Sequence, residues 1–364
     1  MRHVQVLTFC WETPVAYELP PSPSLKYLAH HRGSKGWLFK ILSLPILAWR
    51  LKKHVQVHSI TLVQSHLYRA HCVNVLSKIL GSRHQVSMLI PDIFPFARGL
   101  GSYVKKIFLG FVFRQADSLV FQSCGMQSHF CQAFPRVQQA ITYVIPNPCD
   151  VSFIKKAMKK PVRSSLPKFS GPFIVFCGRL IPGKRPADLL EAFGRIKDIY
   201  PDWHLVFLGQ GSEESSLNQA IIDQDLQDRV HMVGHASNPF PILGKSEIFV
   251  SCSESEGWPN VIVEALACQC AVIAADCLSG PREMLDDNKD YSSLLSDSMH
   301  LGQYGILYPV GHIAWLQKVL EMLIQDSALR KRYQEIGQQR SQDFDLGKIL
   351  PRYREILIDA NKQS

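Results

Sequence analysis

Acidic residues are scarce in the first 150 residues of this 364-residue sequence, which hold 5 Asp and Glu against 16 Lys and Arg. That half therefore carries a net charge of +11, whereas residues 151–364 hold 26 acidic and 24 basic residues, a net of −2. A basic half of this kind suggests an anionic partner, either a nucleic acid or a membrane surface. A basic surface with no dedicated partner explains the charge equally well.

The sequence also lacks a Cys-x-x-Cys pair, an N-terminal signal peptide and an apolar run long enough to cross a bilayer. Its ten cysteines show no paired spacing, and Cys268 and Cys270 are too close together for a usual zinc pair. The most apolar segment, Trp37–Leu51, is shorter than the roughly 20 residues that a membrane helix needs, and it contains Pro45. These absences favour a reduced, cytoplasmic protein without a structural metal.

Short apolar strands alternate with helical segments along the chain, a pattern typical of a parallel sheet covered on both faces. The pattern predicts two doubly wound, Rossmann-like α/β domains in tandem, with ligands bound in the cleft between them, beyond the carboxyl ends of their strands. We place the first domain at residues 1–155, a lysine-rich linker at 156–172 and the second domain at 173–345. Residues 346–364 are expected to form a helix that packs back toward the first domain.

One stretch, Ser253–Leu285, has the features of an anion-binding site. A buried strand is expected to lead into the turn Gly257–Asn260, and a helix is expected to begin near Pro259. The first N–H groups of a helix are unpaired and favour negative charge, so this turn suits a phosphate. Glu256 and Glu264 flank the turn, and their carboxylates suit sugar hydroxyls. These features suggest a nucleotide-sugar site, whereas helix capping and a surface carboxylate are the structural alternative.

Two further loops that follow expected strands carry candidate residues. Arg179 and Lys184 lie before a helix predicted at Pro186, where two cations can hold a diphosphate. Gly209-Gln210-Gly211 follows another strand, as in a dinucleotide-binding fingerprint, but Glu214 stands where the third glycine is needed. A dehydrogenase is therefore disfavoured. The two glycines either let the backbone approach a ligand or make a tight turn.

These motifs occur in a fixed order: Gly178-Arg179-Leu180 with Lys184, Leu208–Gly211, Glu256–Asn260 with Glu264, and Ser279–Glu283. In that order they resemble the family 4 glycosyltransferases of GT-B fold, including those that build bacterial polysaccharides, lipid-linked oligosaccharides and lipopolysaccharide core. The resemblance is specific over residues 173–285, and in the N-terminal half it rests in outline on Gln64–Ala70 and Val144–Pro148. It implies a retaining transferase that moves a hexosyl or N-acetylhexosaminyl group from a nucleotide-sugar, expected to be a UDP-sugar. It also implies that no metal or other cofactor is needed, and we find no Asp-x-Asp suited to bridging a metal and a diphosphate.

The resemblance also assigns roles to single residues. Arg179 and Lys184 are expected to hold the donor diphosphate and stabilise the leaving group. Glu256 is expected to bind the donor sugar and Glu264 the ribose hydroxyls. For Glu283 and its neighbour Arg282, an internal ion pair and a ligand contact are equal alternatives. The other donor-site candidates lie in loops of the second domain: Gly178, Gly209, Gly211, Gly234, Asn238, Gly257, Trp258 and Asn260.

This sequence departs from the family pattern at two places. The strand expected at Val4–Phe9 follows Met1 almost directly, so the first βα unit, with its glycine-rich loop, is expected to be missing. Either the true start of the protein lies upstream of Met1, or the protein is shortened and impaired. Many members place a histidine after the strand that corresponds to Val86–Ile90, where this chain has Asp92. Asp92 and His66 are the acceptor-side candidates, with a structural role as the alternative for both. The second functional hypothesis is therefore a truncated, inactive GT-B protein that still binds a nucleotide or a partner.

Basic residues stand among apolar ones in residues 26–53, around Trp37 and Trp49, and again at Lys105 and Lys106. This combination suits docking on anionic lipid headgroups, and a membrane-attached glycan acceptor would explain it. No base-stacking or groove-reading motif accompanies the charge, so nucleic acid is disfavoured. The sequence thus predicts a cytoplasmic enzyme, peripheral to the inner face of the plasma membrane. In the second segment the aromatic residues are expected in the core: Phe108, Phe111 and Phe113.

Overall fold

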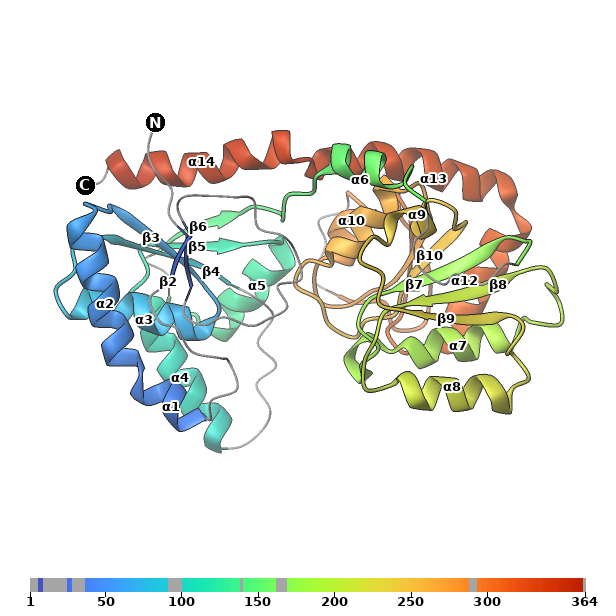
Figure 1. Cartoon of the computed structure of the whole chain (residues 1–364), viewed down its shortest axis with the longest axis horizontal. Helices are drawn as coiled ribbons and strands as arrows, with labels where there is room; N and C mark the ends of the chain where they lie inside the picture. Colours follow the sequence, from blue (N-terminus) through green and yellow to red (C-terminus); the bar gives the residue numbers. More distant parts are fainter. Residues whose placement is uncertain are drawn as a thin grey trace.

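Figure 1 shows the computed structural model, in which the chain forms two α/β domains. The structure describes residues 6–8, 25–27, 37–90, 100–137, 140–161, 169–287 and 293–362. Each domain is built on a largely parallel β-sheet flanked by helices, as the alternating sequence pattern predicts. The prediction of a missing first βα unit concerns residues 1–36, most of which lie outside this described part.

The N-terminal domain contains the four-stranded parallel sheet β3-β4-β5-β6. Its strands are Leu62–His66, Gln85–Leu89, Ser118–Phe121 and Ile141–Val144. Its helices are α1 (Trp37–Leu42), α2 (Leu44–Val57), α3 (Tyr68–Ile79), α4 (Leu100–Arg114) and α5 (Cys124–Ala133). Every residue of β5 is buried, because helices cover both faces of an inner parallel strand. A separate parallel pair joins β1 (Val6–Thr8) to β2 (Leu25–Tyr27).

The structure tests two expectations about the helices of this domain, one for Pro45 and one for the aromatic residues of α4. Pro45 lies in the first turn of α2, where its fixed φ and missing N–H are tolerated, so it starts a helix rather than breaking one. Phe113 is buried as expected, but the prediction of core positions for Phe108 and Phe111 was wrong. Helix α4 turns a different set of residues inward, with Leu109 and Val112 beside Phe113, which leaves Phe108 and Phe111 half exposed.

The C-terminal domain contains a seven-stranded sheet in the order β12-β13-β11-β10-β7-β8-β9. Only the pairing of β12 with β13 is antiparallel. In chain order, β7 to β13 are Phe173–Cys177, His204–Leu208, Val230–Gly234, Ile248–Ser251, Ala271–Ala275, His300–Leu301 and Ile306–Tyr308. The α-helices are α7 (Pro186–Gly194), α8 (Glu214–Asp223), α9 (Phe240–Leu243), α10 (Asn260–Ala267), α11 (Pro281–Leu285), α12 (Ile313–Gln325) and α13 (Ser327–Ser341). The 3-10 turns are η1 (Pro182–Lys184) and η2 (Gln342–Phe344).

Two helices connect the domains. Helix α6 (Val151–Ala157) extends into the predicted linker, and its residues Val151 and Ile154 belong to the core of the C-terminal domain. Helix α14 (Leu346–Lys362) runs back over the N-terminal domain (Figure 1). There Ile349 and Ile356 pack with Leu89, Val120 and Ile145 in one buried cluster. The chain therefore completes the N-terminal core with residues from its other end.

Candidate donor site

The donor-site candidates gather at the carboxyl ends of β7, β8, β9 and β10. Gly178 follows β7 and donates its N–H to the carbonyl of Leu208 at 2.9 Å, while Gly209 donates to the carbonyl of Gly234 at 2.8 Å. A Cβ atom on Gly209 would lie 1.8 Å from the carbonyl oxygen of Gly178, and one on Gly211 would lie 2.0 Å from that of Leu180. These two glycines are required because neighbouring loops touch backbone to backbone. Their contact with a ligand remains a prediction.

The predicted diphosphate clamp and the predicted sugar-binding carboxylate meet directly. Lys184, the last residue of η1, forms an ion pair with Glu256, which follows β10. Both side chains are half-buried or more, so water weakens this pair less than it would a surface pair. Arg179 lies earlier on the same loop and is exposed. The structure therefore places two cations and one carboxylate at the same edge of the sheet.

A residue without a predicted role holds the cationic loop in place. Arg185 has φ +49°, a left-handed conformation that is unusual for any residue but glycine, asparagine or aspartate. Its side chain pairs with the buried Asp188 one turn into α7, with N–O distances of 2.7 and 3.2 Å. Such a two-pronged ion pair fixes the guanidinium plane. Arg185 thereby locks the end of η1 and the position of the adjacent Lys184.

The loop at Ser279 and Gly280 contacts the turn before α10 and supports it. The Ser279 hydroxyl donates to the carbonyl of Glu256, and a Cβ on Gly280 would lie 2.6 Å from Cδ of Pro259. Gly280 has φ +87°, so its lack of a side chain serves both the contact and the backbone conformation. The sequence motif contained both residues, but no local signal showed that they support the turn.

Trp258 is buried and Glu264 is partly buried. Glu264 lies just past the first turn of α10, and burial raises the pKa of its carboxyl group. The Trp258 ring is buried against Phe344 at a centroid distance of 5.2 Å. Its indole N–H has no hydrogen-bond partner among the described residues. The Trp258 side chain thus joins the turn to the domain core, while Glu264 is a partly enclosed acceptor.

Two thiols lie close to Glu264. Burial, and then the negative charge of Glu264, raises the pKa of Cys177 at the end of β7 to about 12. The same two causes, in the same order, raise the pKa of Cys149, also to about 12. Both thiols are therefore neutral near neutral pH, so neither adds a negative charge beside Glu264.

The remaining candidates on the second domain make hydrogen bonds within the protein. Gly234 has φ +74° at the end of β9 and accepts the hydrogen bond from Gly209. The Asn238 amide nitrogen donates to the carbonyl of Ala157 at 3.2 Å, which ties it to α6. Its amide oxygen is buried and has no partner within the described residues. Such an oxygen is costly to bury unless something donates to it, so it is available to accept from an N–H group of a ligand.

Two contacts join this site to the N-terminal domain. The Asn147 amide donates to the side-chain oxygen of Asn260, the first residue of α10, at 3.0 Å. The Glu283 carboxylate accepts from the backbone N–H groups of Cys124 and Gly125, both at 2.8 Å. These are the first N–H groups of α5, where the helix dipole also favours a negative charge. Within the described residues, the Glu283 side chain therefore makes these two backbone hydrogen bonds and no ion pair, while the ligand contact weighed from the sequence stays a prediction.

The neighbour Arg282 does form an internal ion pair. Its guanidinium binds the fully buried carboxylate of Asp276, with one N–O distance of 2.9 Å. Asp276 also accepts from the backbone N–H of Leu295 at 2.8 Å. Of the two alternatives weighed for Arg282 from the sequence, the structure therefore shows the internal ion pair.

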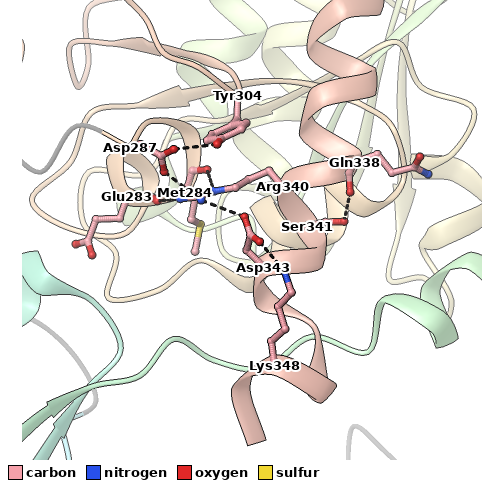
Figure 2. A network of polar contacts seen from close by, with 9 residues as sticks. All are labelled: Glu283, Met284, Asp287, Tyr304, Gln338, Arg340, Ser341, Asp343 and Lys348. Atoms are coloured by element: carbon pink, nitrogen blue, oxygen red, sulfur yellow. Dashed lines mark hydrogen bonds and ion pairs between the residues drawn. The ribbon is translucent and has the colours of Figure 1, made fainter. Parts of the chain in front are cut away.

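Arg340 anchors the helix that carries Glu283. Figure 2 shows its guanidinium between the C-terminal end of α11 and the residues that lead into α14. It donates to the carbonyls of Glu283 at 2.8 Å and Met284 at 3.2 Å. It also pairs with Asp287 and Asp343, and Asp343 in turn pairs with Lys348. The Glu283 side chain points away from this network (Figure 2), which leaves its carboxylate for the N-terminal domain.

On the acceptor side the structure describes only one of the two candidates. His66 ends β3, opposite Leu89 at the end of β4, and is exposed. It therefore lies at the carboxyl edge of the N-terminal sheet, where a cleft residue is expected. Asp92 lies outside the described residues. In the described part of the chain we find no cluster of three or more His, Cys, Asp or Glu that could hold a metal ion.

Comparison with known proteins assigns a family to this arrangement. The model of the family described as glycosyl transferases group 1 matches residues 159–340. A Campylobacter jejuni relative, N-acetylgalactosamine-N,N'-diacetylbacillosaminyl-diphospho-undecaprenol 4-alpha-N-acetylgalactosaminyltransferase, is 26% identical over 340 residues, covering 92% of this chain and 86% of its own. Among solved structures, a glycosyltransferase from Rickettsia africae has a TM-score of 0.72 at 17% identity, and Anabaena HepE in complex with UDP one of 0.69 at 19%. Each alignment covers 92% of this chain and 86% of the other. These likenesses confirm the GT-B fold expected from the sequence.

Proposed function

The chain belongs to the group 1 family and is a glycosyltransferase, and on this premise we propose that it uses a UDP-sugar to extend a membrane-attached glycan. The group transferred is a hexosyl or N-acetylhexosaminyl group. The reaction retains the anomeric configuration and needs no metal. The observation that carries the proposal is the ion pair between Lys184 and Glu256, since Glu256 stands shortly before α10, the helix that contains Glu264.

The chemistry of glycosyl transfer accounts for this arrangement. The bond between the anomeric carbon and the terminal phosphate oxygen breaks, and its electron pair leaves with the nucleoside diphosphate. The acceptor hydroxyl oxygen bonds to the same carbon on the face that the diphosphate leaves, and its proton passes to the departing phosphate oxygen. Negative charge therefore grows on the diphosphate while the sugar ring becomes oxocarbenium-like. Fixed positive groups at the diphosphate lower this barrier.

We assign the charge-stabilising role to Lys184 and Arg179. When the donor enters, its diphosphate draws the Lys184 ammonium group away from Glu256, and Glu256 accepts hydrogen bonds from the donor sugar instead. Arg179 adds a second cation from the same loop. Glu264 accepts from the ribose hydroxyls, because it is the partly enclosed carboxylate of α10. Two side-chain cations and the N–H groups of α10 supply the positive charge that a metal would otherwise provide.

The acceptor part of the proposal draws on the Campylobacter jejuni relative. That enzyme is named for an acceptor attached to diphospho-undecaprenol, which is a lipid. A lipid-linked acceptor would place this chain at the cytoplasmic face of a membrane, as the basic N-terminal half also suggests. Among the described residues, no helix is both long and apolar enough to cross a bilayer.

Calorimetric titration of UDP tests the donor site. We expect Lys184→Ala and Glu264→Ala to weaken UDP binding about tenfold to a hundredfold, because each removes a charged partner of the ligand. The matched controls Lys331→Ala and Glu335→Ala change exposed residues of α13 and should bind UDP like the unaltered protein. Unchanged UDP affinity in both site variants would contradict the assignment.

Turnover is tested separately from binding. The protein is incubated with a panel of nucleotide-sugars and an undecaprenyl-diphosphate glycan, and release of nucleoside diphosphate is measured with and without EDTA. We expect release that EDTA leaves unchanged, and a product with the donor's anomeric configuration by NMR. UDP binding without any release would instead favour the inactive, nucleotide-binding alternative.

A further inference from the structure

Helix α4 presents an apolar stripe to solvent. Its outward positions follow helical spacing at i, i+3, i+4 and i+7, and all four are apolar and between 50 and 59% exposed. They are Val104, Ile107, Phe108 and Phe111. Tyr103 beside them is exposed as well. Single exposed apolar residues are ordinary, but a whole stripe marks an interaction surface.

Helix α2 carries a second stripe of the same kind. Leu42 at the end of α1, then Ile46 and Trp49 on α2, recur at helical spacing and are exposed, Leu42 to 73%. Lys53 continues the stripe one turn later, with its ammonium group 3.8 Å from the centre of the Trp49 ring. An indole next to an ammonium group is an arrangement suited to the boundary between lipid tails and headgroups.

The charge on these helices has one sign. Helices α2 and α4 together hold six Lys and Arg residues and no Asp or Glu. On the outward sides, Lys53, Lys105 and Arg114 are exposed. A protein partner with both acidic and basic residues would be repelled wherever its basic residues met these lysine and arginine side chains. A uniformly anionic surface would be attracted at every position.

The helices that carry the two stripes are connected through α3. Helix α2 packs along α3, and Lys52 of α2 donates to the carbonyl of Leu80 at the end of α3 at 2.6 Å. Helix α3 in turn contacts α4. In Figure 1, α1 and the first turns of α4 both reach the lower end of this domain, away from α14 and from the helices of the C-terminal domain.

We propose that the exposed stripes of α1–α2 and α4 form a membrane-binding surface for bilayers with anionic headgroups. Apolar side chains enter the outer part of the acyl region, and the lysine and arginine side chains contact the headgroup phosphates. This inference deepens the proposed function, because it names the surface on which a lipid-linked acceptor is reached. Its physical basis is independent of catalysis.

Vesicle flotation without any nucleotide-sugar tests this surface. The probes are vesicles of phosphatidylcholine alone and vesicles containing phosphatidylglycerol. We expect the protein to float with the anionic vesicles, and salt to reduce the bound fraction. The double variant Ile107→Ser/Phe108→Ser should bind at least about tenfold more weakly, since two half-exposed apolar side chains no longer enter the bilayer. The pair Ile46→Ser/Trp49→Ser tests the other stripe in the same way.

The matched control changes two equally exposed apolar residues of the other domain. Ile199→Ser/Ile222→Ser alters side chains that are 61 and 54% exposed, and it should leave flotation unchanged. Circular dichroism is used to check that each variant keeps its fold. The proposal is overturned if the unaltered protein does not bind anionic vesicles. It is also overturned if all three double variants bind these vesicles as strongly as the unaltered protein does. Light scattering that shows a dimer lost on Ile107→Ser/Phe108→Ser, without vesicle binding, would assign the surface to protein contact instead.

The outcome can be separated from that of the proposed function. Failure of flotation, with nucleoside-diphosphate release intact on a detergent-dissolved acceptor, would remove only the membrane surface. Flotation without any release would keep the membrane surface and remove the enzyme proposal.

Discussion

The Glu283 carboxylate and the backbone N–H of Gly125 lie 2.8 Å apart across the boundary between the two domains. The contact connects the loop that supports the donor turn to the first turn of α5 in the N-terminal domain. Ser279 and Gly280 of that loop also contact Glu256 and Pro259 of the donor turn. The two domains are therefore coupled, through this loop, by a continuous series of contacts that leads from α5 to the donor turn.

Replacing this carboxylate tests the coupling. Glu283→Gln removes the charge that favours the N-terminus of α5, and its amide NH₂ group cannot accept from the second N–H. We expect the contact between the two domains to weaken by about 1–2 kcal/mol. Turnover should fall while UDP affinity stays the same, because all the nucleotide contacts proposed above lie on the C-terminal domain. Kinetics with calorimetry measure both quantities, and Glu335→Gln is the control. A variant that lost UDP affinity and kept its turnover number would refute this.

A glycine substitution probes the same boundary by volume instead of charge. A Cβ on Gly125 would lie 2.9 Å from Cβ of Ser279 and 3.0 Å from the carbonyl oxygen of Leu278. Gly125→Ala should therefore push the domains apart and increase the radius of gyration in small-angle scattering. Gly101→Ala in α4 is the matched control, because no atom lies within 4 Å of its added Cβ. If both variants scatter alike, the contact is too soft to set the domain arrangement.

Nucleotide binding should depend on pH through Glu264. Burial raises the pKa of this carboxyl group, so it takes up a proton at a higher pH than the roughly 4.3 of an ordinary glutamate. A protonated Glu264 accepts ribose hydroxyls less well, and UDP affinity should fall as the solution is acidified. Titrations of UDP at several pH values measure the effect. Glu264→Gln should show only the part that comes from the phosphates of UDP, and an identical pH profile in both proteins would contradict the prediction.

Stability should fall in mild acid because of three buried histidines. Burial lowers the pKa of His71, His84 and His231, each to about 4. Since the unfolded chain takes up protons at about pH 6.5 and the folded chain does not, the unfolding free energy decreases as the pH falls from about 6.5 toward 4. Glu264 and Glu283 act in the opposite direction, because their pKa values are raised.

Urea unfolding at a series of pH values measures this loss. His71, the most deeply buried of the three, should contribute roughly 1.5 kcal/mol between about pH 6.5 and pH 5, and His84 and His231 should contribute less because solvent screens them more. His84→Gln keeps a side chain that can bond to Asn74 but cannot titrate, so its unfolding free energy should vary less with pH. An unchanged slope in this variant would show that His84 is protonated in the folded state as well.

The strands and the donor turn could be predicted because their signals are local. An apolar run followed by Gly257-Trp258-Pro259 is legible within a dozen residues, and the structure has β10 and α10 there. The ordered motifs then identified the family, which no single motif could do.

The contacts between the domains could not be predicted in this way. Glu283 and Cys124 are 159 positions apart, and nothing near either residue signals the other. The pairing of Lys184 with Glu256 across two loops was missed for the same reason, since each was assigned a ligand instead. The outward stripe of α4 was missed because a run such as Phe108–Phe113 is apolar on both sides of the helix. Only packing decides which side is buried.

The route of α14 has a consequence for how the protein is made. Ile349 and Ile356 complete a core whose other members, among them Val120 and Ile145, leave the ribosome about 200 residues earlier. At roughly 5–20 residues per second, the nascent N-terminal sheet waits about 10–40 s for its last apolar cover. During that interval its uncovered face is open to chaperones and to aggregation. Production of the N-terminal half alone would make that exposure permanent.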